Sequence, residues 1–351
     1  MSNIINNNIY IDELEKLNVN NNLNIFNNKT VLITGASGMI GSCLIDTLLY
    51  NKELNVRIIG LMRNLEKAKE RFSYYEDDSR LSLVECDINK NIELSVDKID
   101  YIFHLASNTH PVQYSTMPID TIMTNIIGTY NILNLASNKK TEKVIFTSSV
   151  EVYGKANSQD DIYDESYCGY IDCNTLRAGY PEAKRTAEAL VQAFIKEKNL
   201  NIVIARLSRV FGSTMKNDDS KASSQFIKNG INNENIILKS KGNQYYSYTY
   251  TPDVISALIF LLNNGKTGEA YNVSNPKCDV TLKEFATTIA KESDTNVIFD
   301  IPNETEKAGF STAINAILDN KKLTDLGWKP EYDFNMAIQH TLKILRKNNH
   351  N

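Results

Sequence analysis

The sequence lacks the features of a secreted, membrane-spanning or metal-binding protein. Its five cysteines are an odd number spread through 351 residues, which is typical of reduced thiols and not of a disulfide framework. Cys168 and Cys173 lie close together, but no second pair of ligands accompanies them, so we predict no metal site. No apolar run approaches the roughly 20 residues of a membrane span. Residues 1–18 also lack a basic segment followed by an apolar core, so we expect a cytoplasmic protein without a membrane partner.

A large excess of charge is also missing. The net charge is −4 and 23% of the residues are charged, which gives no reason to expect nucleic acid as a partner. Hydrophobic residues make up 42% of the chain, an ordinary share for a globular protein. The length allows one large domain or two modest ones with buried cores.

The chain changes character after its first 28 residues. These contain eleven asparagines and one short apolar pattern, so we expect residues 1–28 to be a weakly held extension with at most one helix. From Thr30, short apolar runs such as "VLITG", "VRIIGLM" and "KVIFTSS" alternate with stretches of helical spacing at 39–50, 121–136 and 182–196. Buried strands that alternate with amphipathic helices predict an α/β fold.

This alternation predicts a Rossmann-type, doubly wound parallel sheet over residues 29–210. After Phe211 it breaks up into short helical and strand-like pieces, which end in a helix over about 335–346. We expect residues 211–351 to form mainly a smaller α+β substrate-binding region, with some segments returning to the first domain.

A glycine pattern lies between the first strand and the first long helix. In "VLITGASGMIGS", Gly35, Gly38 and Gly41 let the chain turn tightly and let backbone N–H groups approach a pyrophosphate at the helix N-terminus. The sequence therefore predicts a bound dinucleotide. The cofactor contacts that we expect are Gly35, Ser37, Gly38, Met39, Ile40, Gly41, Arg63, Asp87, Ile88, Leu105, Ala106, Ser107, Asn125, Tyr180 and Lys184.

The end of the second strand bears on which dinucleotide binds. Enzymes that prefer NAD usually carry an acid there for the ribose 2′-hydroxyl, but this chain has Arg63 and no acid before Glu66. A guanidinium suits a 2′-phosphate. NADP(H) is therefore favoured and NAD(H) remains open, since Arg63 is alternatively a solvated surface arginine.

Tyr180 and Lys184 form the candidate catalytic pair. They lie four residues apart on one helical face, and Pro181 places the tyrosine at the helix start. A free tyrosine has a pKa of about 10, and a nearby ammonium lowers it, so that the phenol can exchange a proton with a substrate hydroxyl. The third member should be a hydroxyl at the end of the fifth strand, where "TSS" offers Thr147, Ser148 and Ser149.

Seven motifs together resemble those of extended short-chain dehydrogenases/reductases, in the nucleotide-sugar epimerase/dehydratase group. They are "TGASGMIG", "HLAS", "TNIIGTYNIL", "SSVEVYG", "YPEAK", "ARLSRVFG" and "LDNKKLTDLGWKP", and they span about residues 29–345. Within this group, the sequence is most similar to the sequences of UDP-glucuronate decarboxylases. The resemblance implies a nucleotide-linked sugar as substrate. It also implies that Ser149, Tyr180 and Lys184 are the catalytic set, with Lys184 holding the nicotinamide ribose.

The chain departs from the pattern of the family on the substrate side. Where 4,6-dehydratases carry Asp-Glu after the catalytic hydroxyl, this chain has Val150-Glu151, which disfavours dehydration and leaves Glu151 as a possible second acid/base or as a structural glutamate. Tyr246 stands where the family has an arginine for the diphosphate, and Arg209 stands in place of an asparagine that contacts substrate. The segment "STAINAILD" also lacks the usual arginine. These changes indicate a re-formed phosphate site.

Arg63 and Val150 together favour an NADPH-dependent reduction of a nucleotide-linked keto sugar, such as a CDP-linked ketose reduced to an alditol for surface polysaccharide. The alternative is an internal-redox epimerase or decarboxylase that retains NAD⁺. A non-catalytic binding protein on the same fold is a third reading. The complete set of Ser149, Tyr180 and Lys184 argues against it.

The predicted helices over 121–136 and 182–196 are apolar on more than one face. Burying a second face of a surface helix needs a partner. The family commonly dimerises through these two helices, so we expect a homodimer.

Overall fold

The computed structural model describes residues 4–108, 114, 116–158, 161–300 and 315–348. Its centre is a seven-stranded sheet in the order β11-β7-β5-β4-β1-β2-β3, and every neighbouring pair is parallel. The strands are β1 (Lys29–Thr34), β2 (Val56–Met62), β3 (Leu81–Glu85), β4 (Tyr101–His104), β5 (Lys143–Ser149), β7 (Ile202–Leu207) and β11 (Ala270–Val273). The inner strands are buried apolar runs, as a sheet covered on both faces requires. The predicted doubly wound α/β fold is confirmed.

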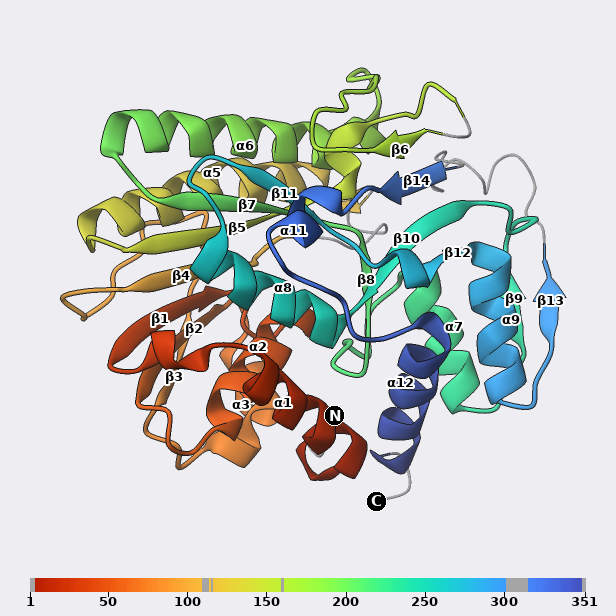
Figure 1. Cartoon of the computed structure of the whole chain (residues 1–351). Coiled ribbons are helices and arrows are strands. Elements are labelled where there is room, and N and C mark those ends of the chain that lie inside the picture. Colours follow the sequence, from red (N-terminus) through yellow and green to blue (C-terminus); the bar gives the residue numbers. More distant parts are fainter. Residues whose placement is uncertain (1–3, 109–113, 115, 159–160, 301–314, 349–351) are drawn as a thin grey trace.

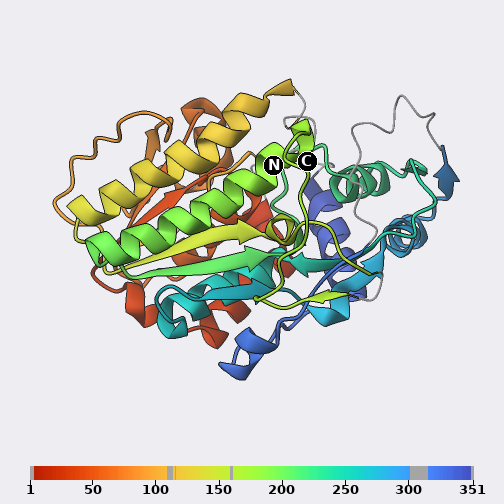
Figure 2. The same ribbon diagram turned by 90° about the horizontal axis from the view of Figure 1, so that it is seen from above.

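Helices cover both faces of this sheet. The helices α5 (Pro118–Asn138) and α6 (Gly179–Lys198) lie side by side on one face, and α2 (Met39–Tyr50), α3 (Leu65–Arg71) and α8 (Thr251–Asn264) lie on the other (Figures 1 and 2). The three stretches of helical spacing in the first domain correspond to α2, α5 and α6, and α2 has the predicted bounds.

A smaller region follows and packs beside the carboxyl ends of the large sheet (Figure 1). Its own sheet has the order β12-β10-β14-β6, with β8 beside β10, and β9 pairs separately with β13. The strands are β6 (Ile162–Tyr163), β8 (Arg209–Phe211), β9 (Ile236–Leu238), β10 (Tyr245–Tyr250), β12 (Asp279–Thr281), β13 (Val297–Phe299) and β14 (Asn315–Leu318). The helices are α7 (Ala222–Ile231), α9 (Leu282–Glu292) and α12 (Phe334–Asn348), whereas α11 (Lys321–Asp325) lies against β11 of the large sheet. An aromatic cluster around Phe211, Phe285 and Phe334 fills its core.

The prediction for residues 1–28 was wrong in one respect. The helix α1 (Asn8–Asn20) is not weakly held, because Tyr10, Leu14 and Leu17 are buried in the main core. Buried Glu13 accepts a hydrogen bond from Tyr250 Oη at 2.8 Å and lies 2.7 Å from His340 Nδ1. The helix therefore joins the large sheet to the C-terminal region.

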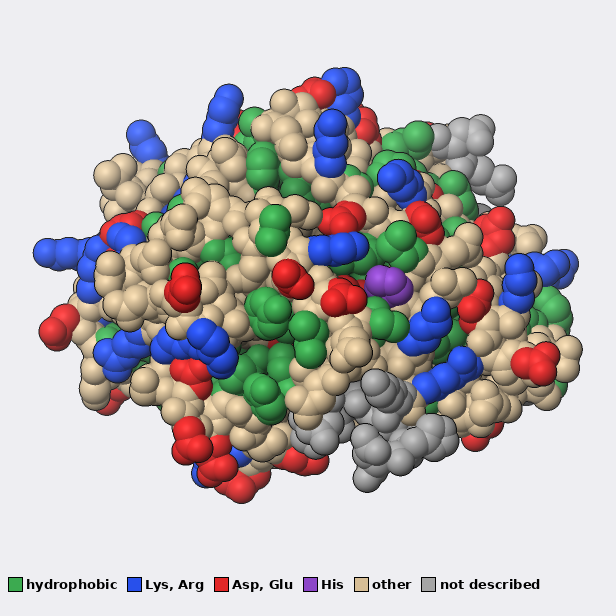
Figure 3. All heavy atoms as spheres, turned by 60° about the horizontal axis from the view of Figure 1, so that its bottom comes forward, with side chains coloured by type: hydrophobic (Ala, Val, Ile, Leu, Met, Phe, Trp, Pro, Cys, Tyr) green, Lys and Arg blue, Asp and Glu red, His purple; other side chains and the backbone are tan. Residues whose placement is uncertain are grey.

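The surface shows no broad region of one charge on the face in Figure 3, where acidic and basic side chains of the described residues are interspersed. Among the helices that the structure describes, none has the length and apolar character needed to cross a membrane. All five cysteines are free thiols.

Candidate functional site

A cavity of about 1510 Å³ lies at the carboxyl ends of β1, β2, β4 and β5 and extends to the C-terminal region. A volume above the usual range for one small ligand suits a dinucleotide together with a second nucleotide. The structure brings nearly all predicted site residues to this cavity. Those that line it are Gly35, Ser37, Gly38, Met39, Ile40, Gly41, Arg63, Asp87, Ile88, Leu105, Ala106, Ser107, Ser149, Glu151, Tyr180, Lys184, Arg209 and Tyr246.

The glycine loop connects β1 to α2 at one end of the cavity. Gly35 has φ +67° and a Cβ there would lie 3.0 Å from the backbone of Ala106, while a Cβ on Gly41 would lie 2.5 Å from the carbonyl oxygen of Gly35. Gly38 caps α2 without a side-chain hydrogen bond, which leaves the first N–H groups of the helix open to an acceptor. This backbone cradle fits the pyrophosphate of a dinucleotide.

The β4 loop is held against this cradle by Thr34. Its Oγ1 accepts hydrogen bonds from the backbone N–H groups of Leu105 and Ala106, both at 3.0 Å. Asn125 was predicted to contact the cofactor, but it does not line the cavity. It is buried in α5 and its Oδ1 accepts a hydrogen bond from Ser107 Oγ at 2.9 Å, so it positions a cavity residue instead.

Arg63 lies at the cavity, just after β2. Its guanidinium donates to Asp120 Oδ2 at 3.1 Å and to Asn108 Oδ1 at 2.8 Å. The arginine thus already has an acidic partner, and a 2′-phosphate near Arg63 would also face that acid. The predicted preference for NADP(H) remains a prediction.

Tyr180 and Lys184 are both buried in the first turns of α6. Burial raises the pKa of Tyr180 to about 12, with a contribution from the charge of Glu151, while hydrogen bonds with Ser149 and Ser107 act in the opposite direction. Burial lowers the pKa of Lys184 to about 8. Its Nζ donates to the carbonyl oxygen of Thr147 at 2.8 Å, which fixes the ammonium at the end of β5. Ser149, Tyr180 and Lys184 therefore line the same cavity, and their catalytic roles remain a prediction.

Two residues that the sequence analysis did not select lie beside this set. The ring of Tyr114 stacks on that of Tyr180, with centroids 4.9 Å apart and planes 19° from parallel. The guanidinium of Arg177 lies 4.9 Å from the centroid of Tyr114 and donates to Glu151 Oε1 at 2.8 Å. Arg177 stands three residues before Tyr180, and this spacing was the signal that the sequence offered for it.

The two substituted positions on the substrate side also meet. Arg209 on β8 lies over the ring of Tyr246 on β10, with its guanidinium carbon 3.5 Å from the ring centroid. Both residues line the cavity. Part of the segment 311–319, the third departure from the family, lies outside the described residues.

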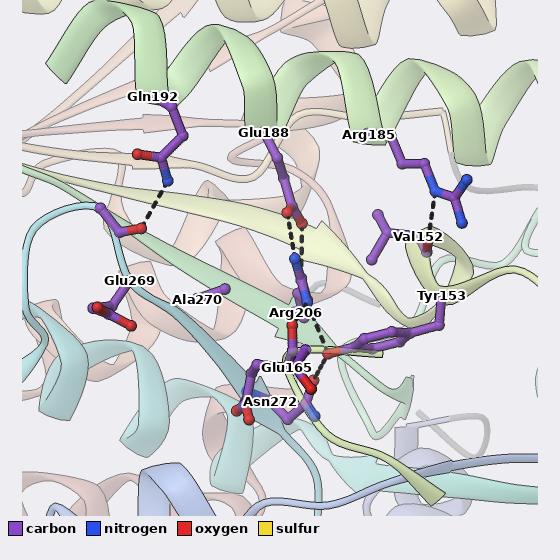
Figure 4. A network of polar contacts seen from close by, with 12 residues as sticks. Val152, Tyr153, Glu165, Arg185, Glu188, Gln192, Arg206, Glu269, Ala270 and Asn272 are labelled. Carbon is purple, nitrogen blue, oxygen red and sulfur yellow. Dashed lines mark hydrogen bonds and ion pairs between the residues drawn. The ribbon is translucent and has the colours of Figure 1, made fainter. Parts of the chain in front are cut away.

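The helix that carries Tyr180 is fastened to the sheet by a network of polar contacts (Figure 4). Glu188 forms two hydrogen bonds with Arg206 on β7, at 2.7 and 3.0 Å, and Arg206 also donates to Tyr153 Oη at 3.1 Å. Arg185 donates to the carbonyl oxygen of Val152 at 2.7 Å. The network links α6 to β7 and to the turn η4 (Val150–Tyr153) that follows Ser149.

Comparisons with known proteins identify the family. The model of the NAD dependent epimerase/dehydratase family matches residues 31–274. A UDP-glucuronic acid decarboxylase from Arabidopsis thaliana is 32% identical over 262 residues, which cover 75% of this chain and 74% of the relative. Another from Danio rerio is 28% identical over 323 residues, covering 91% of this chain and 73% of the relative.

Solved structures share the fold. A dTDP-glucose 4,6-dehydratase from Streptomyces venezuelae, solved with NAD bound, has a TM-score of 0.77 at 22% identity and covers 92% of this chain and 98% of its own. A UDP-glucuronic acid 4-epimerase from Bacillus cereus, solved with UDP-glucuronic acid and NAD, has a TM-score of 0.74 at 21% identity and covers 91% and 99%.

Proposed function

Because the chain belongs to the NAD dependent epimerase/dehydratase family, we propose that it is an internal-redox epimerase or decarboxylase that retains NAD⁺ and acts on a nucleotide-linked sugar. The observation that carries this proposal is the meeting of Ser149, Tyr180 and Lys184 beside a backbone cradle for a dinucleotide. The relatives named as decarboxylases support it. Net reduction by NADPH is the weaker reading, because Arg63 already pairs with Asp120.

The chemistry assigned to the chain is proton transfer. A bound nicotinamide would supply the hydride acceptor and donor. Tyr180 takes the proton from a sugar hydroxyl that Ser149 holds, and Lys184 lowers the energy of the phenolate that results. The raised pKa of Tyr180 in the absence of ligand means that the phenol keeps its proton until a positive charge arrives beside it. Glu151 is the second candidate acid or base for the step that follows oxidation.

The first experiment identifies the cofactor and tests Tyr180. We expect the purified protein to carry NAD⁺ and to convert a nucleotide-linked sugar without a net change in nicotinamide absorbance. Tyr180→Phe should lower kcat by roughly 10²- to 10⁴-fold, because it removes the general base, and should leave cofactor binding nearly intact. Tyr74→Phe, an exposed tyrosine outside the cavity, is the matched control and should keep full activity.

Two results would contradict the proposal. One is a protein that purifies empty, binds NADPH and oxidises it with a nucleotide-linked keto sugar, which would restore the reductase hypothesis. The other is a Tyr180→Phe variant with normal turnover.

A homodimer is part of the same proposal. Four large apolar side chains on α5 are exposed and form one stripe at helical spacing, and they are Ile119, Met123, Ile127 and Tyr130. Water-exposed apolar stripes of this kind mark interaction surfaces. We assign this stripe to contact with a second copy of the chain.

A further inference from the structure

Arg177 connects the two residues to which proton transfer has been assigned. It belongs to the turn η5 (Leu176–Ala178), which leads into α6. Its Nη2 donates to Glu151 Oε1 at 2.8 Å, and its guanidinium carbon lies 4.9 Å from the ring centroid of Tyr114. The ring of Tyr114 stacks on that of Tyr180, again with 4.9 Å between the centroids. Continuous contacts therefore run from Glu151 through Arg177 and Tyr114 to Tyr180.

These contacts form part of the cavity wall and are partly removed from water. All four side chains line the cavity. Tyr114 and Tyr180 are buried, and the side chains of Arg177 and Glu151 are 34% and 27% exposed. Charges at such a site are screened less by water and salt than charges on an open surface. The charges of Glu151 and Arg177 therefore act on the phenol of Tyr180.

The proposed reaction brings a second negative charge to this wall. Tyr180 must lose its proton before it can take one from a sugar hydroxyl, and the phenolate then shares the cavity with the carboxyl group of Glu151. Two negative charges close together oppose each other. Burial is the main cause of the raised pKa of Tyr180, the charge of Glu151 adds to the rise, and the charge of Arg177 opposes it. The wall therefore already contains a cation that offsets the carboxylate.

We propose that Arg177 is a positioning residue that neutralises Glu151 and holds Tyr114 against Tyr180, so that the phenolate of Tyr180 forms in a cavity that also carries a carboxylate. This inference rests on the proposed function, since it takes Tyr180 as the base. Arg177 acts through Glu151 and Tyr114, and it takes no proton itself.

An arginine suits this position better than a lysine. The guanidinium is planar, so its edge can bond a carboxylate while its face rests on an aromatic ring. Arg177 makes both contacts at once, with Glu151 and with Tyr114. An ammonium on a flexible stem keeps the charge but does not match both partners in one geometry.

Other groups around the phenol of Tyr180 also influence its ionisation. Lys184 on α6 and Arg209 on β8 line the same cavity, and the hydroxyls of Ser149 and Ser107 act to lower the pKa of Tyr180. These groups are kept in every variant compared below, so a difference between the variants reports on Arg177 and Glu151.

The test follows the ionisation of Tyr180 and needs no substrate. Full-length protein loaded with NAD⁺ is titrated from about pH 7 to 11 while the near-ultraviolet absorbance of ionised tyrosine is recorded. Subtracting the titration of the same protein with Tyr180→Phe added isolates Tyr180 from the other tyrosines. We expect Arg177→Gln to raise the titration midpoint of Tyr180 by about 1 pH unit, because the phenolate loses a nearby cation. Arg177→Lys, which keeps the charge, should give a smaller rise.

A double variant tests whether Arg177 acts through Glu151. Adding Glu151→Gln to Arg177→Gln should bring the midpoint of Tyr180 back towards that of the parent protein, because both charges are then absent. A midpoint that stays as high in the double variant as in Arg177→Gln would contradict the inference.

Arg185→Gln is the matched control on α6. Arg185 donates to the carbonyl oxygens of Val152 and Gly169 at 2.7 and 2.8 Å, and it does not line the cavity. Its loss loosens the same helix start without removing a charge from the cavity. We therefore expect Arg185→Gln to lower the stability of the protein and to leave the midpoint of Tyr180 unchanged.

Two further results would overturn the inference. One is an Arg177→Gln midpoint equal to that of the parent protein, and the other is an equal rise in Arg185→Gln, because a looser helix start would then be the cause. A Tyr180 that titrates alike with and without NAD⁺ would instead contradict the proposed function, in which the positive charge of the cofactor makes the phenol release its proton.

Discussion

The ammonium of Lys184 is buried at the end of β5, and this burial lowers its pKa from the usual 10.5 to about 8. The same burial raises the pKa of Tyr180 from 10.0 to about 12. The raised pKa keeps the phenol of Tyr180 protonated in the empty site, so that the pair holds at most one charge, the ammonium of Lys184. A group that is easily neutralised suits proton transfer, because the protein does not have to hold two charges in an apolar surrounding before the ligands arrive.

The shift of Lys184 makes the stability of the protein depend on pH. The unfolded chain keeps the lysine proton up to about pH 10.5, whereas the folded chain loses it above about pH 8, so raising the pH from 8 to 10 favours the folded state. We expect the free energy of unfolding of the parent protein to rise, relative to that of Lys184→Met, by about 2–3 kcal/mol over this range. Urea unfolding at the two pH values measures it.

Lys329→Met serves as the control, because Lys329 is exposed. The free energy of unfolding of this variant, relative to that of the parent protein, should not change between pH 8 and 10. A difference in the free energy of unfolding between the parent protein and Lys184→Met that stays constant from pH 8 to 10 would contradict the lowered pKa of Lys184.

Most of the proposed catalytic and cofactor residues that line the cavity could be located from the sequence, because local spacing places them. The glycine loop and the pair Tyr180 and Lys184 each lie within one turn or one strand–helix junction. Arg177 and Tyr114 could not be predicted, since their roles depend on contacts between residues that are far apart in the chain. The pairing of Arg63 with Asp120 was missed for the same reason. It weakens the interpretation of Arg63 as a residue that binds the 2′-phosphate of NADP(H).

At the scale of elements, α6 carries Tyr180 and Lys184, and its orientation depends on polar contacts along its length. The side chains of Glu188 and Arg206 are only 13% and 14% exposed, so this ion pair is mostly removed from water. Breaking a buried pair leaves one charge uncompensated, which is much more destabilising than losing an exposed pair.

Glu188→Gln should lower the free energy of unfolding by roughly 2–4 kcal/mol, and kcat should fall because the helix start that holds Tyr180 loses its support. Chemical denaturation and steady-state kinetics measure the two effects. The control on the same helix is Glu182→Gln, whose contact with Arg185 is 3.5 Å long and more exposed, and which should change stability by less than about 1 kcal/mol. Equal effects of the two substitutions would contradict the role given to the network.

The helix α1 shows why composition misleads at this scale. Eleven asparagines in the first 28 residues suggested a weakly held segment. Tyr10, Leu14 and Leu17 nevertheless recur at the spacing of one helical face, and Asn7 caps the helix by accepting a hydrogen bond from the N–H of Ile9. The asparagines occupy the cap and other positions outside that buried face, so they do not prevent packing.

At the scale of the whole molecule, the alternation of strands and helices was enough to predict the doubly wound sheet. The C-terminal region was predicted only in outline, because its short strands pair with partners from distant parts of the chain, as β6 does with β14. Short strands carry little periodicity of their own, so their pairing cannot be inferred from local patterns.

The exposed stripe on α5 leads to a prediction about assembly. We expect a dimer in solution, and Ile127→Glu should shift it towards monomer, because it places a charge in the centre of an apolar contact. Light scattering coupled to size exclusion measures the mass. Val19→Glu puts the same change on an exposed apolar residue of α1 and should leave the mass unchanged. A monomeric parent protein would contradict the assignment.

The packing of α1 has a consequence for how the chain is made on the ribosome. Asn7 Nδ2 donates to the carbonyl oxygen of Ile344, and Glu13 lies against His340, so the first helix is completed by contacts with the last. During synthesis, α12 appears more than 300 residues after α1. The face of α1 that contacts α12 therefore stays uncovered until α12 has been made.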